Sequence, residues 1–284
     1  MIQQQTVNVI LQWIEENLEK DIYLEDITVL SGYSRRHIQS LFKNYVDMTI
    51  GAYIRQRKLC RAALLLHLTN LSIIDIAIRL NFDSQQSFSR EFKKLFGRSP
   101  GQYRNSPEWD LTYLRAPHLV NKRDIPKFEL CHLQDQFYRG YQFAYEVGLL
   151  NDIYPDMSTF RLDGIKENLN KHQNDIYLVS DFVASQSKSG AICVTTNIGI
   201  KTDSEQLMPD AKSFHSEAGL YAHFHFEGEW NTYAELSNHI YLEELPARGL
   251  KRRAGGDIEH IHYDGTIITD TKHWITCDYF IPIE

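Results

Sequence analysis

Two short stretches of this sequence are rich in arginine, glutamine, serine and lysine and nearly free of acidic residues. The first contributes Arg35, Arg36, Gln39, Ser40 and Lys43, and the second contributes Gln85, Gln86, Ser87, Ser89, Arg90, Lys93 and Lys94. Such side chains hydrogen-bond to base edges in the major groove and to nearby phosphates. A merely solvated helix face would mix acidic with basic residues, whereas Glu91 alone interrupts the second stretch. The two stretches therefore predict binding to double-stranded DNA.

The two stretches occupy equivalent places in an internal repeat, whose offset is 49 residues at first and 50 residues later. Asp26-Ile27 recurs as Asp75-Ile76, Phe42-Lys43 as Phe92-Lys93, and Gly51 as Gly101. A one-residue insertion near a turn explains the change of offset. Each copy is predicted to form a helix, a tight turn and a second helix, and the polar stretch lies on the second helix. This is the arrangement of a recognition helix that enters the major groove.

Local signals indicate where these helices begin and end. Gly32 and Gly97 are expected to end helices because glycine adopts a positive φ without a Cβ clash. Ser34 and Ser72 are expected to cap helices, as is either Asp83 or Ser84. A long helix from Thr49 to about His67 is expected to join the two copies. The predicted apolar stripes are Val7, Ile10, Leu11, Ile14 and Leu18, then Ile38, Leu41, Phe42 and Tyr45, then Phe88, Phe92, Leu95 and Phe96. With a short helix at the start of each copy, these signals predict about seven helices.

Length and charge divide the chain into two parts. The 284 residues suggest two domains. The net charge is −7, yet residues 1–107 hold 14 basic and 10 acidic residues, which leaves a net charge of −11 on the remainder. A basic half joined to an acidic half indicates a polyanion-binding domain and a second domain for another partner, although charge can also vary by chance.

Several classes of protein are excluded by what the sequence lacks. No apolar run approaches the ~20 residues that span a bilayer, and the first residues do not resemble a signal peptide. The four cysteines form no CxxC pair, which argues against a zinc ribbon or a disulfide scaffold. We therefore expect a cytoplasmic protein without a membrane partner.

The remainder of the chain changes to a strand-like pattern. Alternating and aromatic-rich segments predict strands near residues 128–133, 138–147, 176–183, 191–196, 220–227, 257–263 and 274–283. Helices are predicted at residues 158–170 and from Asn231 or Thr232 through Leu245. The order, strand–helix–strands repeated, predicts an α+β domain of two similar halves. The predicted domains are residues 1–107 and 124–284, with a linker at residues 108–123.

The second domain also carries the residues of a possible effector pocket. Its candidate ligand-binding residues are the aromatics Tyr221, Phe224, Trp230 and Trp274 and the carboxylates Glu259 and Asp278. Aromatic walls with an unpaired carboxylate favour hydrophobic cations and amphiphiles. The alternative is that most of these aromatics simply pack helix on sheet.

The sequence gives weaker support for a metal site or a catalytic site than for an effector pocket. His223, His225 and Glu227 share one strand face, and His260 and His262 repeat the pattern, but one strand rarely supplies all the ligands of a metal. No nucleophile elbow, P-loop or Rossmann glycine run is present. We therefore predict no metal, no cofactor and no catalytic residue.

Residues 6–107 resemble the AraC/XylS class of bacterial transcription regulators. The matching stretches are Gly32-Tyr33-Ser34, His37-Ile38-Gln39, Leu41-Phe42-Lys43, Gly51 to Arg55, Ile76-Ala77, Phe82 to Lys93 and Ser106 to Trp109. The resemblance implies that a monomer places two recognition helices in adjacent major-groove segments and activates transcription by contacting RNA polymerase. It also implies groove contacts by Gln85, Gln86, Ser87 and Arg90. The first helix keeps Gln39 but departs from the family pattern at Arg36 and Ser40.

The remainder resembles the GyrI-like effector-binding domain. A DNA-binding part that comes first and a domain of this kind that follows it are the order of the Rob-type members of the class. The matching features are Glu227-Gly228, Gly256 to Glu259 and the terminal Phe280 to Ile283. The resemblance implies that Asp278, where the family can carry a glutamate, faces the effector. These observations predict a ligand-responsive transcription regulator. The alternative is a small-molecule binding or sequestering protein with a vestigial DNA-binding role.

Overall fold

The computed structural model describes residues 2–106, 108–115, 127–148, 155–202, 212–234, 236–266 and 274–284. These residues form two compact units. The helical unit comprises residues 2–106 and 113–115, and the sheet unit comprises residues 108–112 and the described residues from 127 onward. No helix among the described residues is long and apolar enough to cross a membrane.

The helical unit contains the predicted helices. Its helices are α1 (Ile2–Glu16), α2 (Leu24–Ser31), α3 (Arg35–Val46), α4 (Ile50–Leu68), α5 (Ile73–Arg79), α6 (Gln85–Phe96) and α7 (Pro100–Arg104). Ser34, Thr49, Ser72 and Ser84 cap α3, α4, α5 and α6, each accepting a backbone N–H with its side chain. Gly32 and Gly97 end α2 and α6 with φ of 68° and 71°, as glycine permits. The expected caps are therefore confirmed, with Ser84 rather than Asp83 at α6.

Each copy of the repeat has its own apolar core. In the first copy α1, α2 and α3 bury Ile10, Ile27 and Phe42. The prediction that Tyr45 belongs to this stripe is wrong, because Tyr45 is exposed and Val46 is buried at the next position. In the second copy Phe88, Phe92 and Phe96 are buried and their rings contact one another along α6, as predicted, whereas Leu95 is only partly buried.

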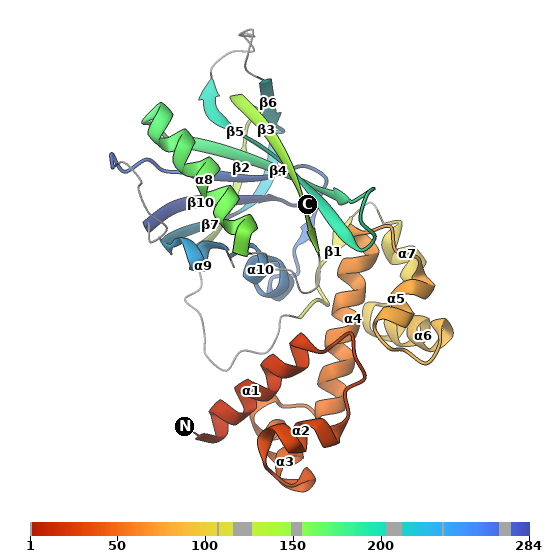
Figure 1. The fold of residues 1–284 in the computed structure, drawn as a ribbon. Helices are drawn as coiled ribbons and strands as arrows, with labels where there is room; N and C mark the ends of the chain where they lie inside the picture. The colour runs from red at the N-terminus through yellow and green to blue at the C-terminus, as the bar shows by residue number, and fades with distance from the viewer. Residues whose placement is uncertain are drawn as a thin grey trace. The chain divides into compact units, whose positions relative to one another are not determined.

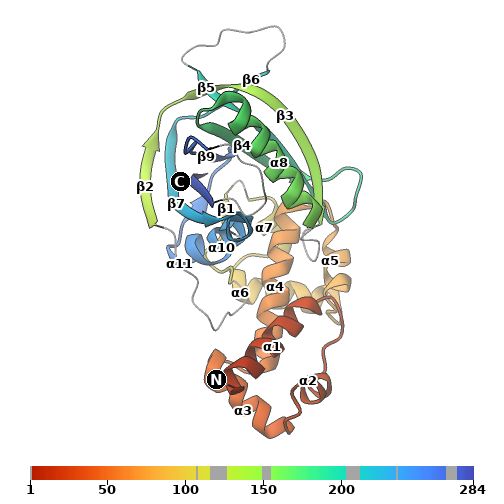
Figure 2. The same ribbon diagram turned by 60° about the vertical axis from the view of Figure 1, so that its left-hand side comes forward.

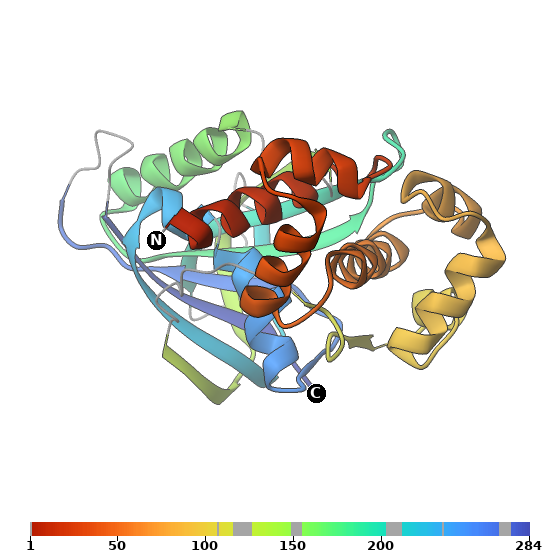
Figure 3. The ribbon, with the colours of Figure 1, turned by 90° about the horizontal axis from the view of Figure 1, so that it is seen from below.

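Helix α4 joins the two copies. It contacts α3 as well as α5, α6 and α7, and Figure 3 shows it nearly end-on with α1–α3 on one side and α5–α7 on the other. Two of its arginines, Arg57 and Arg61, contact α1. Arg57 contacts both carboxylate oxygens of Glu15, at 2.7 and 3.0 Å, and Arg61 donates to the Glu15 carbonyl at 3.0 Å. Burial opposes the charge of Arg57, but Glu15 outweighs it and raises the Arg57 pKa.

The sheet unit is built on eight antiparallel strands in the order β2-β7-β10-β9-β4-β5-β3-β6. Their bounds are β2 (Lys127–Leu133), β3 (Gln136–Gly148), β4 (Ile176–Ala184), β5 (Ala191–Thr202), β6 (Lys212–Ser216), β7 (Gly219–Glu229), β9 (Asp257–Ile261) and β10 (Trp274–Pro282). Sequence analysis missed β6 and ended β5 too early. Gly140 and Gly199 let β3 and β5 approach closely, because a Cβ at Gly140 would lie 1.8 Å from the Ile198 carbonyl oxygen.

Helices cover one face of this sheet. They are α8 (Pro155–His172), α9 (Trp230–Ala234), α10 (Leu236–His239), a π-helical turn (Ile240–Glu244) and α11 (Leu245–Ala247). Helix α8 contacts β4 and β5, and α9 contacts β7 and β10. In Figure 2 the arc of strands from β2 to β3 surrounds α8 and α10. We call this covered side the helix face.

Strand register assigns the predicted carboxylates to opposite faces. Glu259 lies opposite Tyr279, which lies opposite Phe224, and all three are on the helix face. Asp278 lies opposite His225 and His260. Because side chains alternate along a strand, Asp278 projects to the other side of the sheet. We call that side the histidine face.

The described part of the predicted linker is anchored on both units. Within the sheet unit, β1 (Trp109–Asp110) pairs with β8 (Lys251–Arg252), and Trp109 stacks on Tyr241 with ring centroids 5.6 Å apart. Within the helical unit, Tyr113 packs edge-on against Phe96. The predicted linker residues 116–123 lie outside the described residues.

Candidate nucleic-acid interface and effector site

The polar side chains predicted on the first recognition helix are exposed on α3. Ser34 caps this helix by accepting the backbone N–H of His37 at 3.4 Å, which leaves Arg36, Gln39, Ser40 and Lys43 on the solvent side. Arg35 forms an ion pair with Glu25 of α2. Since both partners are more than half exposed, at 64% and 55%, this pair contributes little stability and leaves Arg35 able to meet a phosphate.

Helix α6 presents the second set in the same way. Gln85, Gln86, Arg90 and Lys93 are exposed, and Ser87 is partly buried next to the cap, where its N–H donates to Ser84 at 3.1 Å. Glu91, the acidic exception on this helix, lies 3.6 Å from Arg55 of α4. Figure 1 shows α3 and α6 as the second helix of each pair. Each therefore carries exposed hydrogen-bonding groups in its first two turns.

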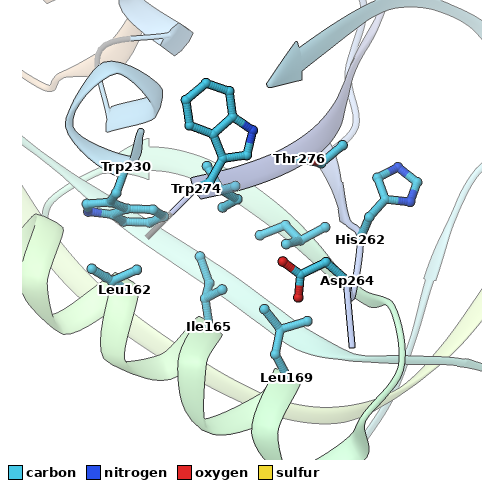
Figure 4. Close-up of a pocket in the computed structure, with 10 residues that line it drawn as sticks. Leu162, Ile165, Leu169, Trp230, His262, Asp264, Trp274 and Thr276 are labelled. Carbon is cyan, nitrogen blue, oxygen red and sulfur yellow. The ribbon is translucent and has the colours of Figure 1, made fainter. Parts of the chain in front are cut away.

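An apolar pocket of about 90 Å³, which we call the helix-face pocket, lies where α8 meets the end of β9 and the start of β10. Its residues are Leu162, Ile165, Leu169, Trp230, Ile261, His262, Asp264, Trp274, Ile275 and Thr276. Figure 4 shows the Trp230 ring beside Leu162 of α8, whereas the Trp274 ring points away from the α8 side chains, and the Asp264 carboxylate lies near Ile165 and Leu169. Trp230 is buried and Trp274 is 59% exposed, so that one tryptophan forms a wall and the other a rim. The volume is below the ~300 Å³ of common drug-sized pockets.

The structure brings together only two of the six predicted ligand-binding residues. Trp230 and Trp274 both line the pocket. Phe224 is fully buried against Phe128, with ring centroids 5.2 Å apart. Tyr221 belongs to the buried cluster of Tyr138, Val179, Phe214 and Ile258 on the histidine face. These two aromatics therefore pack within the core.

The expectation of an unpaired carboxylate in an aromatic pocket is wrong for Glu259. Its side chain is fully buried, forms an ion pair with Arg161 and accepts a hydrogen bond from the Tyr233 hydroxyl. Burial disfavours the charge of Arg161, but Glu259 outweighs it and raises the Arg161 pKa. The charge of Glu259 is thus already balanced inside the protein.

The same expectation is wrong for Asp278, which histidines surround. Its Oδ1 lies 2.8 Å from His223 Nε2 and 2.7 Å from His225 Nδ1, and its Oδ2 lies 2.6 Å from His262 Nε2. Burial acts to raise the pKa of Asp278, but the hydrogen bonds from these histidines lower it well below its usual value. The His225 pKa is raised by the hydrogen bond to Asp278 and then by Glu227.

Sequence reasoning missed several residues of this region. The apolar residues Leu162, Ile165 and Leu169 of α8 follow helical spacing, which the sequence shows. Their position beside the tryptophans cannot be inferred from that spacing. Asp264 follows β9 in a turn, where it accepts the backbone N–H of Thr266 at 2.9 Å. A second hollow of about 200 Å³ on the histidine face includes Tyr177, Lys201, His260 and Phe280. Asp175, His260 and His262 form a group that could hold a metal ion.

Comparisons with known proteins agree with this architecture. A helix-turn-helix domain model matches residues 30–106, and the model of the GyrI-like small molecule binding domain matches residues 143–284. The chain is 37% identical to the F1 operon positive regulatory protein of Yersinia pestis, with 100% of this chain and 89% of that protein covered. It is 30% identical to the right origin-binding protein of Escherichia coli and 29% identical to the transcriptional regulator Rob of Salmonella typhimurium, covering 97% of this chain and 96% of each relative.

These matches extend over both units and include relatives that are named as regulators of transcription. The chain therefore belongs to the AraC-type transcription regulators of the Rob architecture, in which two helix-turn-helix units precede a GyrI-like small-molecule-binding domain.

Proposed function

We propose that this regulator activates transcription by reading two adjacent DNA half-sites with α3 and α6, and that a small hydrophobic or cationic effector in the helix-face pocket modulates it. The observation that carries the DNA part is the exposed polar surface of both helices. Arg35, Arg36, Gln39, Ser40 and Lys43 supply the first set, and Gln85, Gln86, Ser87, Arg90 and Lys93 supply the second. The name of the Yersinia relative, a positive regulatory protein, supports activation.

The chemistry of the side chains on α3 and α6 indicates which of them contact bases and which contact phosphates. Glutamine and arginine can make paired hydrogen bonds to base edges, whereas lysine at the following turn suits a phosphate. We assign base contacts to Gln86 and Arg90 and backbone contacts to Lys43 and Lys93. Arg57 and Arg61 of α4 are left out of this interface, because Glu15 already holds both.

The test of DNA recognition is selection of bound sequences from random duplexes by the full chain. We expect an asymmetric site with two blocks of preference about one helical turn apart. Binding to that site should weaken with salt, at roughly −0.9 in the log–log slope for each neutralised phosphate. Enrichment of no sequence, with ligand binding intact, would favour the sequestering function instead.

The effector part rests on the lining of the pocket. Three α8 aliphatic side chains and two tryptophans offer an apolar surface, and Asp264 adds one carboxylate at the edge. A ligand that inserts an apolar group and leaves a cation beside Asp264 fits this lining. Titration of tryptophan fluorescence with cationic and neutral amphiphiles of equal chain length tests it, and an unchanged signal with both would contradict it.

Further parts of the proposal concern partners and boundaries. We propose that RNA polymerase is the protein partner, that the protein acts without catalysis and that it works in the cytoplasm, as its family role implies. We also propose that residues 1–107 and 124–284 are the functional domains, joined through residues 108–123. A fragment that ends at Ser106 and binds the selected duplex would support these boundaries.

A further inference from the structure

Four histidines from two strand regions converge with four carboxylates on the histidine face. His223 and His225 lie on β7, His260 lies on β9 and His262 follows it. The carboxylates are Glu129 on β2, Asp175 before β4, Glu227 on β7 and Asp278 on β10. The objection that one strand rarely supplies all the ligands of a metal site therefore does not apply to the folded cluster.

Every imidazole in this cluster has a carboxylate oxygen near each of its two ring nitrogens. His262 Nε2 lies 2.6 Å from Asp278 Oδ2, while its Nδ1 lies 3.4 Å from Asp175 Oδ2. His260 Nε2 lies 2.7 Å from the same Asp175 oxygen, and its Nδ1 lies 3.9 Å from Asp278 Oδ2. A neutral imidazole donates from one nitrogen only. In a neutral ring the other nitrogen directs a lone pair at a carboxylate, an arrangement that a proton or a bound metal cation relieves.

Three of these groups are spaced for one cation. Asp175, His260 and His262 each offer a ligand atom, and the three atoms lie within 4.8 Å of one another. Bonds of about 2.0–2.2 Å place neighbouring atoms of a tetrahedral zinc site roughly 3.3–3.5 Å apart. The distance of 3.4 Å between Asp175 and His262 already matches this edge. The 2.7 Å distance to His260 needs to open by about 0.6 Å, within the reach of side-chain rotation.

The surroundings hold these three groups in place. The backbone N–H of Tyr263 donates to Asp175 Oδ1 at 2.9 Å, which leaves Oδ2 facing both rings. His260 stacks on Tyr177 with ring centroids 4.3 Å apart. Asp278 takes the far nitrogen of His262, as outer carboxylates do for histidines that bind metals.

We propose that Asp175, His260 and His262 form a binding site for a divalent transition-metal ion of the zinc type, with Asp278 as the outer carboxylate that orients His262. Two imidazoles and one carboxylate suit Zn²⁺, and the partial exposure of all three side chains leaves a further position for water or a ligand atom. The site goes beyond the proposed regulatory function and does not depend on it.

The location of the site connects it with both hollows of the sheet unit. His262 belongs to the wall of the helix-face pocket, and His260 belongs to the hollow on the histidine face. The ion would also bridge the start of β4 to the end of β9. Metal binding is therefore expected to alter effector affinity, and by thermodynamic linkage the effector would alter metal affinity by the same factor.

The experiment is titration of the metal-free full chain with Zn²⁺ by calorimetry, and with Co²⁺ by visible absorption. We expect one metal ion to bind per chain, and we expect the absorption spectrum of bound Co²⁺ to be that of an ion with a low coordination number. His260→Gln and Asp175→Asn should each weaken binding by at least about tenfold, and Asp278→Asn by about 10- to 100-fold. The matched control is His132→Gln, an exposed histidine on β2 whose side chain lies on the other face of the sheet.

Failure of a variant to fold is separated from loss of a ligand by recording thermal unfolding without metal. His262→Gln provides a second conservative change if His260→Gln is unstable. Equal Zn²⁺ affinity in the control and in the variants of Asp175, His260 and His262 would overturn the proposal, because the ion would then bind elsewhere. Absence of stoichiometric Zn²⁺ and Co²⁺ binding by the wild-type chain would overturn it as well. Neither result bears on DNA binding, which is measured separately.

Discussion

Helices α3 and α6 of the helical unit and the helix face of the sheet unit use charged side chains in opposite ways. Arg36 and Arg90 stand exposed on α3 and α6, where they pay no desolvation penalty in the free protein and can meet a polyanion. In the sheet unit Asp257 and Glu259 are fully buried, and each forms an ion pair with an arginine. Asp257 also accepts hydrogen bonds from two tyrosine hydroxyls, and Glu259 accepts one. The charge on α3 and α6 is thus available to a partner, whereas the charge on the helix face maintains the fold.

The largest expected effect comes from breaking a buried pair in the sheet unit. Arg161→Met leaves the Glu259 carboxylate buried without its cation, which should lower the free energy of unfolding by about 3–5 kcal/mol. The double variant Arg161→Met/Glu259→Met removes both charges and should recover most of that loss. Arg36→Met is the exposed control and should change stability by less than about 0.5 kcal/mol. Denaturant unfolding measures all three, and a loss below about 1 kcal/mol in the single variant would contradict the comparison.

This contrast also explains why the helical unit was predictable from the sequence. Its signals are local: Ser34 and Ser84 cap helices three residues away, and the phenylalanine stripe of α6 needs only helical spacing. The internal repeat and the exposed polar set follow from the same short windows. Tyr45 was misplaced because an apolar stripe is wide enough to admit either of two adjacent positions, and Val46 is the one that the fold buries.

The sheet unit depends on partners that are distant in the sequence. Its α+β order and most of its strands were predicted, since alternation is also local. However, Arg161 and Glu259 are 98 residues apart, and Asp278 and His223 are 55 apart. Alternation shows that Asp278 and Glu259 each face one side of a sheet, but only the strand register shows that the sides are opposite. The sequence therefore identified the two carboxylates but could not identify the arginine and the histidines that contact them.

A second prediction concerns alkaline pH and the hydroxyl of Tyr138. Burial raises the Tyr138 pKa to about 12, above the value near 10 in an unfolded chain. The stability contributed by the neutral hydroxyl is complete below pH ~10 and is lost as pH rises toward 12. Two pH units correspond to about 2–3 kcal/mol. Because Tyr138→Phe lacks this ionisation, its unfolding free energy should fall less between pH 9.5 and 12 than that of the wild type. If the unfolding free energies of the wild type and Tyr138→Phe changed in parallel with pH, the pKa of Tyr138 would not be raised in the folded protein.

Next in size are the effects on DNA recognition. Arg90→Ala and Gln86→Ala should each cost about 1–3 kcal/mol at one or two base pairs and relax preference there. Lys93→Ala should weaken all sequences about equally and reduce the salt slope by about one unit. Gln12→Ala on the exposed side of α1 is the control. Competition binding with single-base variants of the selected site distinguishes these outcomes. If Arg90→Ala and Lys93→Ala behave alike, α6 does not read bases.

The smallest expected effect distinguishes the two carboxylates that have been considered for the effector. Asp264 lines the helix-face pocket and is exposed, so its attraction for a bound cation is screened and amounts to about 0.2–1 kcal/mol. Asp264→Asn should then weaken a cationic amphiphile by up to about fivefold and leave its neutral analogue unchanged. Asp278→Asn, measured in the presence of a chelator, should not weaken the cationic ligand more than the neutral one, because Asp278 does not line the pocket and contacts it only through His262.

Quenching of Trp230 and Trp274 fluorescence reports both affinities, and Trp274→Phe separates the rim from the wall. If Asp278→Asn weakened the cation while Asp264→Asn did not, the effector would bind on the histidine face, and the hollow beside Tyr177 and Phe280 would replace the helix-face pocket as its site. The two faces would then exchange roles: the helix face would only hold the fold together. Ligand-induced protection of His260 from chemical modification provides an independent measurement of that outcome.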